Sequence, residues 1–370
     1  MPTIRVRLDK LSHDITVGCR IVDKLSLQLN RATKGERLFV IYDANFYALH
    51  GKSLSKIIRR FKNSVEIVIP SGERIKSTAE LNRLRDFLLK ERISRSDFIL
   101  AVGGGVTSDL VGFAAATTLR GIRWGVVSTT LLGMVDASIG GKTGINHPMG
   151  KNLVGAFWQP AFVWGDTQYL STLPRREIVS GLGELLKYAG LIGDPMIEMI
   201  ARYLNKGLLI DEKRIVPMIT RGARYKAEIV AEDERESGRR RVLNLGHTFA
   251  HGIENALGYG KLRHGEAVIL GLLAASELSL MRRKRRSREL AEYCELVRES
   301  VGLVPVRKVT GEQIVSAMSL DKKRIGRKLH FVLLEKPGKP IIVDAPPDRE
   351  VRKSISAMLD YYAKHGGQRA

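Results

Sequence analysis

The chain has few cysteines and no compositionally biased segment. Among its 370 residues only Cys19 and Cys294 are cysteines, and they lie far apart without the spacing of a metal site. A disulfide framework is therefore not expected, and the reducing cytoplasm is the compartment that fits best. The sequence also shows no low-complexity tract and no internal repeat, as expected for an ordinary globular protein.

Long apolar runs of the kind that cross membranes are also missing. The N-terminus, MPTIRVRLDK, alternates apolar and polar residues like a first strand and lacks the apolar centre of a signal peptide. The most membrane-like stretch, Ile99–Leu119, contains three consecutive glycines and Asp109, which a bilayer helix would not carry comfortably. A buried strand, a glycine loop and a helix explain this stretch better, so we expect a soluble protein without a membrane partner.

Acidic residues are scarce relative to basic ones: 39 Asp and Glu face 61 Lys and Arg, for a formal charge of +22. Such an excess suits nucleic acid, anionic lipid or an acidic substrate. The basic run Arg282–Arg288 (RRKRRSR) is most simply interpreted as an exposed helix end or loop. A nucleic-acid patch would need interleaved aromatic residues or a known binding fold, and neither is evident. We expect no nucleic-acid partner, although a basic nucleic-acid-binding protein is the alternative from another functional class.

The length of the chain, and a change from alternating strand and helix patterns to long helical patterns, predict two domains. Apolar runs with strand character and one periodic helix alternate in the first part: Arg37–Asp43, Val65–Pro70, Glu80–Glu91 (the helix), Phe98–Val102 and Trp124–Ser128. Beyond Leu173 long helical patterns follow: Arg176–Leu191, Arg214–Ala231, Thr248–Leu257 and Glu266–Met281. We therefore predict an α/β N-terminal Rossmann-like domain over residues 1–172 and a mainly α-helical C-terminal domain over residues 173–370, with Pro174 at the boundary.

A glycine loop, Val102–Asp109 (VGGGVTSD), follows a predicted strand and precedes an apolar helix. Backbone N–H groups in such a loop can approach a pyrophosphate at a helix N-terminus. The loop departs from the dinucleotide fingerprint G-x-G-x-x-G because Ser108 stands at the third glycine position. Asp43, at the end of an earlier strand, suits ribose hydroxyls. From the pattern, a nucleotide site and a purely structural turn are both open.

A second phosphate-loop signature fails on spacing. Gly140–Gly144 (GGKTG) contains the GKT of an ATPase loop, but that motif needs glycine at position 136, where Asp136 stands. An ATPase is therefore excluded. Lys142, Lys151 and Asn152 still present ammonium and amide donors that suit an anionic ligand.

Histidines gather in one short segment. His247 and His251 lie one helical turn apart, and His264 follows closely. The HTFAH sequence differs from the zinc-protease motif, because Thr248 replaces the glutamate that acts as base. Pattern alone leaves a coincidental surface pair as an alternative, and it leaves His251 and His264 competing as metal ligands.

A catalytic metal commonly takes three protein ligands, often two histidines and a carboxylate. Glu184 is the best carboxylate, since it lies in an otherwise apolar helical segment with Lys187 one turn later. Burying both groups is costly unless they are paired, liganded or functional. A buried Glu184–Lys187 pair that holds two helices together is the alternative to a metal site.

These residues belong to long stretches that resemble the 3-dehydroquinate synthase family of sugar-phosphate cyclases. The similarity runs from Asp43 to the Asp321–Lys323 segment, and its most specific stretches are Ser128–Phe157, Leu173–Ala189, Arg240–Glu254 and His264–Val268. Two departures are small: Ser128 stands where proline is usual, and Gly133 replaces alanine. The run Arg282–Arg288 has no counterpart role in the family pattern.

The resemblance implies a full set of site residues. The metal ligands, for zinc or cobalt, fall on Glu184, His247 and His264. The implied NAD contacts are Asp43, Ser71, Gly72, Glu73, Arg74, Ile75, Lys76, Gly105, Val106, Thr107, Ser108, Asp109, Thr129, Thr130, Lys142, Lys151, Tyr169, Leu170, Ser171 and Thr172. The implied substrate contacts are Arg120, Asn152, Lys187, Lys226, Arg240, Asn244 and one of Lys322 or Lys323, and the implied catalytic groups are His251, Lys142, Glu236 and Asp136.

The resemblance also implies the reaction: 3-deoxy-D-arabino-heptulosonate 7-phosphate becomes 3-dehydroquinate and phosphate, in the shikimate pathway of aromatic amino-acid biosynthesis. C5 of the substrate is oxidised with NAD, phosphate is eliminated, C5 is reduced again, and the opened ring closes by an aldol step. Arg120 would reach the neighbouring subunit's site, which implies a homodimer. A sibling sugar-phosphate cyclase and a metal-dependent glycerol-phosphate or alcohol dehydrogenase are the alternatives, and Glu236, Arg240, Asn244 and His251 favour dehydroquinate as the product.

Overall fold

The computed structural model describes residues 1–61, 63–258, 260–283, 287–325 and 329–369, apart from the side chains of residues 10 and 320–325. The chain forms two compact units. Unit 1 comprises Met1–Leu173 and Ile210–Arg235, and unit 2 comprises Pro174–Leu209 and Glu236–Ala370. Our predicted second domain ran unbroken from residue 173, whereas the structure groups Ile210–Arg235 with unit 1.

A seven-stranded sheet forms the centre of unit 1, with the strand order β1-β2-β9-β6-β5-β3-β4. Only β1 is antiparallel to its neighbour, as the register from Thr3↔Thr16 to Val6↔His13 shows; the other pairs are parallel. The strands are β1 (Thr3–Val6), β2 (His13–Gly18), β3 (Leu38–Asp43), β4 (Val65–Ile69), β5 (Phe98–Gly103), β6 (Arg123–Ser128) and β9 (Phe162–Asp166). The strands predicted from apolar runs are confirmed.

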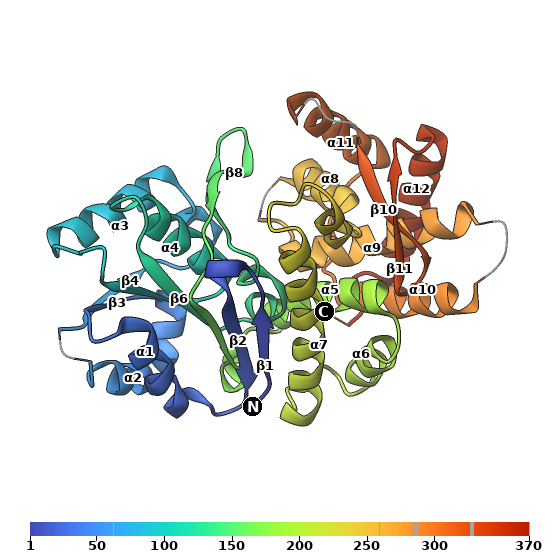
Figure 1. The fold of residues 1–370 in the computed structure, drawn as a ribbon. Helices are drawn as coiled ribbons and strands as arrows, with labels where there is room; N and C mark the ends of the chain where they lie inside the picture. The colour runs from blue at the N-terminus through green and yellow to red at the C-terminus, as the bar shows by residue number, and fades with distance from the viewer. Residues whose placement is uncertain (62, 259, 284–286, 326–328, 370) are drawn as a thin grey trace. The chain divides into compact units, whose positions relative to one another are not determined.

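Helices cover both faces of this sheet (Figure 1). On one face α1 (Leu25–Thr33) and α2 (Ala44–Ile58) pack in the core that contains Val40 and Leu100, and on the other α3 (Thr78–Lys90) and α4 (Gly105–Thr117) pack in the core that contains Phe39 and Ile99. Successive residues of β3 and β5 thus enter different cores, as the strand period of two requires. Because both faces are buried, these strands are apolar throughout, and the α/β prediction is confirmed.

Helix α7 (Glu212–Glu232) belongs to unit 1 because it packs on β1, β2 and the π-helical turn η4 (Gly133–Ala137). Its buried residues include Ile215, Met218, Ile219, Ala223, Ala227 and Val230. The predicted helix is confirmed, but its amphipathic pattern specified only that one face is buried and left its packing partner open.

Unit 1 also carries an antiparallel hairpin of β7 (Lys142–His147) and β8 (Gly150–Phe157), which we did not predict (Figure 1). Gly144 and Gly155 face each other in it, and a Cβ on Gly155 would lie 2.1 Å from the backbone oxygen of Thr143. The two backbones therefore approach more closely than side chains would allow.

Unit 2 is mainly helical and includes one two-stranded sheet. Its elements are α5 (Arg175–Ile192), α6 (Met196–Asn205), α8 (His247–Leu257), α9 (His264–Met281), α10 (Arg288–Val301), α11 (Gly311–Ile325), α12 (Asp348–His365), β10 (His330–Lys336) and β11 (Lys339–Asp344). Among the described residues α9 alone is long and apolar enough to cross a membrane. Of its 18 residues, 78% are buried inside the structure. A helix that is apolar on all sides and buried fits the core of a helical domain, so the predicted mainly α-helical region is confirmed.

Candidate active site

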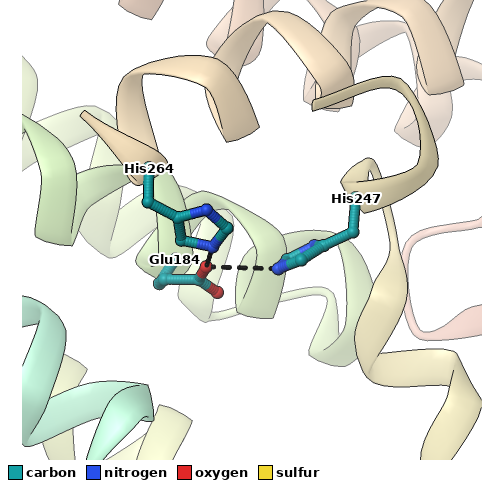
Figure 2. Close-up of side chains that lie close together, drawn as sticks. All are labelled: Glu184, His247 and His264. Atoms are coloured by element: carbon teal, nitrogen blue, oxygen red, sulfur yellow. Dashed lines mark ion pairs between the residues drawn. The ribbon is translucent and has the colours of Figure 1, made fainter. Parts of the chain in front are cut away.

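Three side chains from three helices of unit 2 converge in one place (Figure 2). Glu184 comes from α5, His247 is the first residue of α8 and His264 the first residue of α9. The Oε1 atom of Glu184 lies 3.5 Å from Nε2 of His247 and 3.4 Å from Nε2 of His264. Bonds of about 2.1 Å in a tetrahedron give edges of about 3.4 Å, so the spacing suits a bound divalent metal.

The burial and the hydrogen bonding of the Glu184 carboxylate also fit a metal site. The side chain is completely buried, and among the described residues neither carboxylate oxygen accepts a well-aligned hydrogen bond. Buried polar atoms are normally satisfied, so a carboxylate in this state fits a metal ligand. One carboxylate and two imidazoles are also a ligand set that catalytic zinc sites use.

Glycines allow the three helices to approach one another. Gly183 precedes Glu184 and Gly265 follows His264; a Cβ on Gly183 would lie 2.2 Å from the backbone oxygen of Gly265, and a Cβ on Gly265 would lie 1.8 Å from that of Ser180. Helices α5 and α9 therefore cross with their backbones in contact, as only glycine permits. This crossing places Glu184 and His264 within reach of one metal ion.

His247 is positioned by another close contact. Gly246, directly before it, has φ of +77° and caps α8, and a Cβ on Gly271 of α9 would lie 2.2 Å from the Gly246 oxygen. Nδ1 of His247 lies 3.1 Å from the carbonyl oxygen of Leu245 and donates to it. With Nδ1 occupied as a donor, the lone pair is on Nε2, which faces Glu184.

An ion pair between a partly exposed arginine and a buried carboxylate anchors the start of α9. Glu266 is fully buried and accepts from Nε and Nη2 of Arg176 on α5, at 2.7 and 2.6 Å. It also accepts from the backbone N–H of Arg263, at 2.7 Å. These contacts hold the first turn of α9, and with it the backbone of His264, against α5.

The charges around Glu184 favour its ionised form. Burial alone would raise the pKa of Glu184, but the charge of Lys187 and the nearby imidazoles of His247 and His264 outweigh it and hold that pKa well below its usual range. Burial would likewise lower the pKa of His264, yet the carboxylates of Glu184 and Glu254 raise it to about 10.

The Glu184–Lys187 pair that competed with the metal site is present as well. Nζ of Lys187 lies 2.5 Å from Oε2 of Glu184, and both side chains are buried. Because both residues lie on α5, this pair does not join two helices. The other oxygen of Glu184 faces the histidines, so the pair and the metal site coexist.

Of the other expected residues of unit 2, His251 lies on α8, Arg240 and Asn244 lie on the 3-10 turn η6 (Arg239–Asn244), and Glu236 precedes that turn. His251 is exposed on α8, with its ring centroid 5.7 Å from that of His247 and 6.2 Å from that of His264. Arg240 is almost completely buried. Nδ2 of Asn244 donates to Oε1 of Glu236 at 2.7 Å, so these two expected site residues contact each other.

In unit 1 the glycine loop opens α4 directly after β5. Gly104 is the N-cap of α4, and a Cβ on Gly104 or Gly105 would lie within 3 Å of the side chains of Thr130 or Ala137. The loop is therefore closely packed by its own neighbours, and among the described residues no side chain makes a capping hydrogen bond to the first turn of α4. Oγ1 of Thr107 is buried without a hydrogen-bond partner among the described residues. The donor set fits a pyrophosphate.

Lys76 joins the expected NAD and substrate residues of unit 1. Its buried Nζ lies 2.6 Å from Oδ2 of Asp109 and 2.5 Å from Oδ1 of Asn152. Burial raises the pKa of Asp109, and the charge of Lys76 opposes that rise. Asn146, which we did not single out, ties the hairpin to this cluster because its backbone N–H donates to the Lys76 oxygen and its Oδ1 accepts from the Asn152 N–H.

Two further groups of expected residues have defined surroundings in unit 1. Nζ of Lys226 on α7 donates to the Asp136 backbone oxygen at 3.0 Å and to its Oδ2 at 2.8 Å. In the turn η5 (Thr167–Thr172), Tyr169 is buried beside His50, whose Nε2 lies 2.8 Å from Oγ1 of Thr172. His50 was missed because a single histidine in a helix pattern carries no signal of its own.

The other expected residues of unit 1 are placed as follows. Asp43 caps α2 by accepting from the N–H of Phe46 at 3.1 Å, and Ser71 accepts from the N–H of Asn45 at 2.9 Å. Thr129 is buried, while Lys142 and Arg120 are exposed. The side chains of Lys322 and Lys323, and residues 284–286 of the basic run, lie outside the described residues.

Three expected site residues other than glycine have a positive φ: +65° at Arg120, +56° at Asn152 and +60° at Glu236. Asparagine tolerates this region, but each of the other two is held there at a cost of about 1–3 kcal/mol. The surrounding structure therefore determines where these side chains lie, as is common where a ligand has to be met in a defined geometry.

Comparison with known proteins identifies the family. The model of the 3-dehydroquinate synthase N-terminal domain matches residues 66–180, and the model of the C-terminal domain matches residues 181–324. The 3-dehydroquinate synthase of Nitrosomonas europaea is 40% identical over 364 residues, covering 96% of this chain and 98% of its own. This chain belongs to the 3-dehydroquinate synthase family. The resemblance inferred from the motif stretches is thereby confirmed.

Solved structures agree with this assignment at the level of the fold. A 2-deoxy-scyllo-inosose synthase complexed with carbaglucose-6-phosphate, NAD+ and Co2+ is 23% identical, covers 96% of this chain and 99% of its own, and has a TM-score of 0.86. The 2-epi-5-epi-valiolone synthase ValA from Streptomyces hygroscopicus, with NAD+ and Zn2+ bound, is 25% identical, with coverage of 96% and 98% and a TM-score of 0.84. An iron-containing alcohol dehydrogenase matches less well, at 16% identity and a TM-score of 0.65.

Proposed function

We propose that this chain catalyses the reaction of its family, the conversion of 3-deoxy-D-arabino-heptulosonate 7-phosphate to 3-dehydroquinate and phosphate. The observation that carries the proposal is the convergence of Glu184, His247 and His264 in a chain that matches curated members over nearly its whole length. The fold alone would also admit an alcohol dehydrogenase, but the higher similarity to cyclases favours carbocycle formation.

NAD and one divalent metal, zinc or cobalt, are the cofactors of the proposed reaction. Glu184, His247 and His264 would hold the metal, and the first turn of α4 with Lys76 and Asp109 would hold NAD. Bound there, NAD supplies reversible hydride transfer and the metal supplies Lewis acidity toward substrate hydroxyls. The neighbours crystallised with NAD+ and Co2+ or Zn2+ support this choice.

The basic side chains of the site would hold the two anionic ends of the substrate. The buried guanidinium of Arg240 suits the carboxylate, because its planar fork binds two oxygens at once. The ammonium groups of Lys142, Lys187 and Lys226 suit the phosphate as compact donors. Fixing both ends places the reacting carbons, so that much of the rate enhancement comes from orientation.

His251 is the protein group best suited to relay a proton near C6. It is exposed on α8 beside the metal ligands, where a substrate can reach its ring. The substrate's own phosphate would act as the base, and Glu236 with Asn244 would form a polar contact that orients the sugar hydroxyls. Asp136, which accepts from Lys226, would fix the position of that ammonium group within unit 1.

The proposed reaction predicts phosphate release without net reduction of NAD. With zinc and a catalytic amount of NAD, the heptulosonate phosphate should yield one phosphate for each substrate molecule, while the NADH absorbance returns to its starting value. The reason is that the hydride removed from C5 is given back in the same turnover. A phosphate assay run alongside absorbance measures both quantities.

A control substrate separates the alternatives. A sugar phosphate without a carboxylate, such as glucose 6-phosphate, should be turned over far more slowly, because it cannot make the carboxylate contact that we propose for Arg240. Stoichiometric accumulation of NADH would instead identify a dehydrogenase, and efficient use of glucose 6-phosphate would identify a sibling cyclase.

We further propose that the enzyme is a homodimer in which Arg120 reaches the neighbouring subunit's site. Arg120 is exposed, and the hairpin β7–β8 exposes four apolar side chains, Met149, Leu153, Val154 and Phe157. Exposed apolar side chains gathered on one hairpin suit an interface between proteins. A second copy of this chain is the partner that the family resemblance implies.

Mixing two inactive variants tests the shared site. Arg120→Ala and His264→Ala homodimers should both be nearly inactive, whereas an equimolar mixture refolded together should recover about a quarter of the wild-type activity. Half of the dimers in such a mixture are hybrids, and each hybrid retains one intact site of two. Recovery by subunit mixing would not occur if Arg120 acted within its own chain.

We place the enzyme in the cytoplasm. Cys19 and Cys294 are both free thiols in the structure, which fits a reducing compartment. The long apolar helix α9 is mostly buried in unit 2. It contains His264 and Glu266, two residues around the proposed metal site.

A further inference from the structure

A buried carboxylate outside the ligand set contacts one of the expected ligands. Glu254 lies on α8, is 4% exposed, and has Oε2 at 3.5 Å from Nδ1 of His264. The opposite ring nitrogen of His264, Nε2, lies 3.4 Å from Glu184. The imidazole of His264 is therefore held between two carboxylates, one at each nitrogen.

The main chain of His264 is held firmly, but that does not orient its ring. Glu266, Arg176 and the close crossing at Gly265 anchor the first turn of α9, whereas the His264 side chain is 34% exposed. A ring with this freedom can rotate about its bond to Cβ and direct a carbon instead of Nε2 toward the metal. A hydrogen-bond acceptor at Nδ1 removes that freedom.

We infer that Glu254 is a positioning residue that fixes the Nδ1–H tautomer and the ring orientation of His264, so that its Nε2 binds the metal. Histidine ligands commonly donate their second N–H to a carboxylate or a carbonyl. His247 follows the same rule with the Leu245 carbonyl. The inference rests on the proposed metal site and extends it to a residue of another helix.

The charge of Glu254 gives it a second effect that the Leu245 carbonyl cannot have. Glu184 and Lys187 carry opposite charges in contact, so together they offset little of a divalent cation's charge. The carboxylate of Glu254, acting through the imidazole, makes His264 a stronger donor to the metal. Replacing it should therefore weaken metal binding even where the ring orientation is preserved.

The surroundings of Glu254 also admit a different interpretation. Ligand atoms of His251, Glu254 and His264 lie within 4.8 Å of one another, as the ligands of a second metal would. A metal there and a metal at Glu184 would both bind His264, through opposite nitrogens. That requires an imidazole without any proton, whereas one N–H donor and one lone pair are its ordinary state at neutral pH. Geometry and chemistry therefore favour a single metal with Glu254 as its outer partner.

Metal affinity, measured by competition with a chromophoric chelator, tests the inference without using enzymatic activity. Glu254→Ala should bind zinc about 10- to 100-fold more weakly than the wild type, and Glu254→Gln should lie between them because its amide oxygen still accepts from Nδ1. Glu277→Gln is the matched control, since Glu277 is a largely buried carboxylate on α9 that pairs with Arg298 at 2.5 Å. This control should keep the wild-type zinc affinity.

Two measurements on the wild type complete the test and do not depend on how a variant folds. Spectra of the ¹⁵N-histidine-labelled, metal-loaded protein should show His264 with its proton on Nδ1 and its metal on Nε2, and titration should give one zinc per chain. Coordination through Nδ1, a second zinc, or an unchanged affinity in Glu254→Ala would overturn the inference. A wild type that binds no zinc would instead overturn the proposed metal site itself.

Discussion

The His264→Ala variant should lose bound metal and turnover together, with activity reduced by about a thousandfold or more. Three ligands are the usual minimum for a catalytic metal, and removing one leaves Glu184 and His247 as a weak pair. A metal that lowers the barrier by about 4 kcal/mol corresponds to about a thousandfold in rate. Metal content and phosphate release, measured on the same preparation, give the result.

The control for this variant is His365→Ala, because His365 lies at the end of α12, outside the candidate site. It should keep both metal and activity. A His264→Ala protein that turns over at the wild-type rate without metal would contradict the central proposal, whereas loss of activity with full metal content would assign His264 a role other than ligand.

The Gly265→Ala variant should be destabilised on the order of 3 kcal/mol and should bind zinc poorly. A Cβ at this position would lie 1.8 Å from the backbone oxygen of Ser180, so α5 and α9 would have to separate. No flexible side chain can absorb the overlap, because the contact is made by backbone. Separation of these helices also moves His264 away from Glu184. Urea unfolding and chelator competition measure the two effects.

Gly311→Ala is the matched control in the same unit. Gly311 is the first residue of α11, and a Cβ there would meet Ile355 at 3.7 Å, an ordinary van der Waals contact. Its stability and zinc affinity should stay close to those of the wild type. Equal effects of the two substitutions would show that the helix crossing does not depend on glycine at position 265.

The two predictions concern different kinds of residue. Histidine and glutamate in ordered motifs indicate a metal site by their chemistry alone, because few residue types bind zinc. The glycine beside each ligand carries no such signal, since glycines at helix starts and turns are common. Its role becomes visible only in the fold, where the nearest backbone atom of the neighbouring helix lies 1.8 to 2.9 Å from the missing Cβ.

The sequence likewise did not predict contacts between segments that lie far apart along the chain. Lys76 was expected to contact NAD and Asn152 to contact substrate, but their mutual contact at 2.5 Å depends on how the β7–β8 hairpin folds back. In the sequence, Glu254 was only the last residue of the stretch Arg240–Glu254 that resembles the family. The contact of Glu254 with His264 depends on how α8 packs against α9. That packing depends on the whole core of unit 2.

The sequence by itself determined the strands β3, β4, β5 and β6 of the central sheet, the helices α3, α5, α7, α8 and α9, the types of ligand and, through long motif stretches, the family. These properties follow from periodicity within one element and from residue chemistry, both of which are local. The tertiary structure decided that α7 packs in unit 1, that Glu184, His247 and His264 converge, and that Glu254 lies behind His264. Such distances between elements depend on packing over the whole core, and no local pattern specifies them.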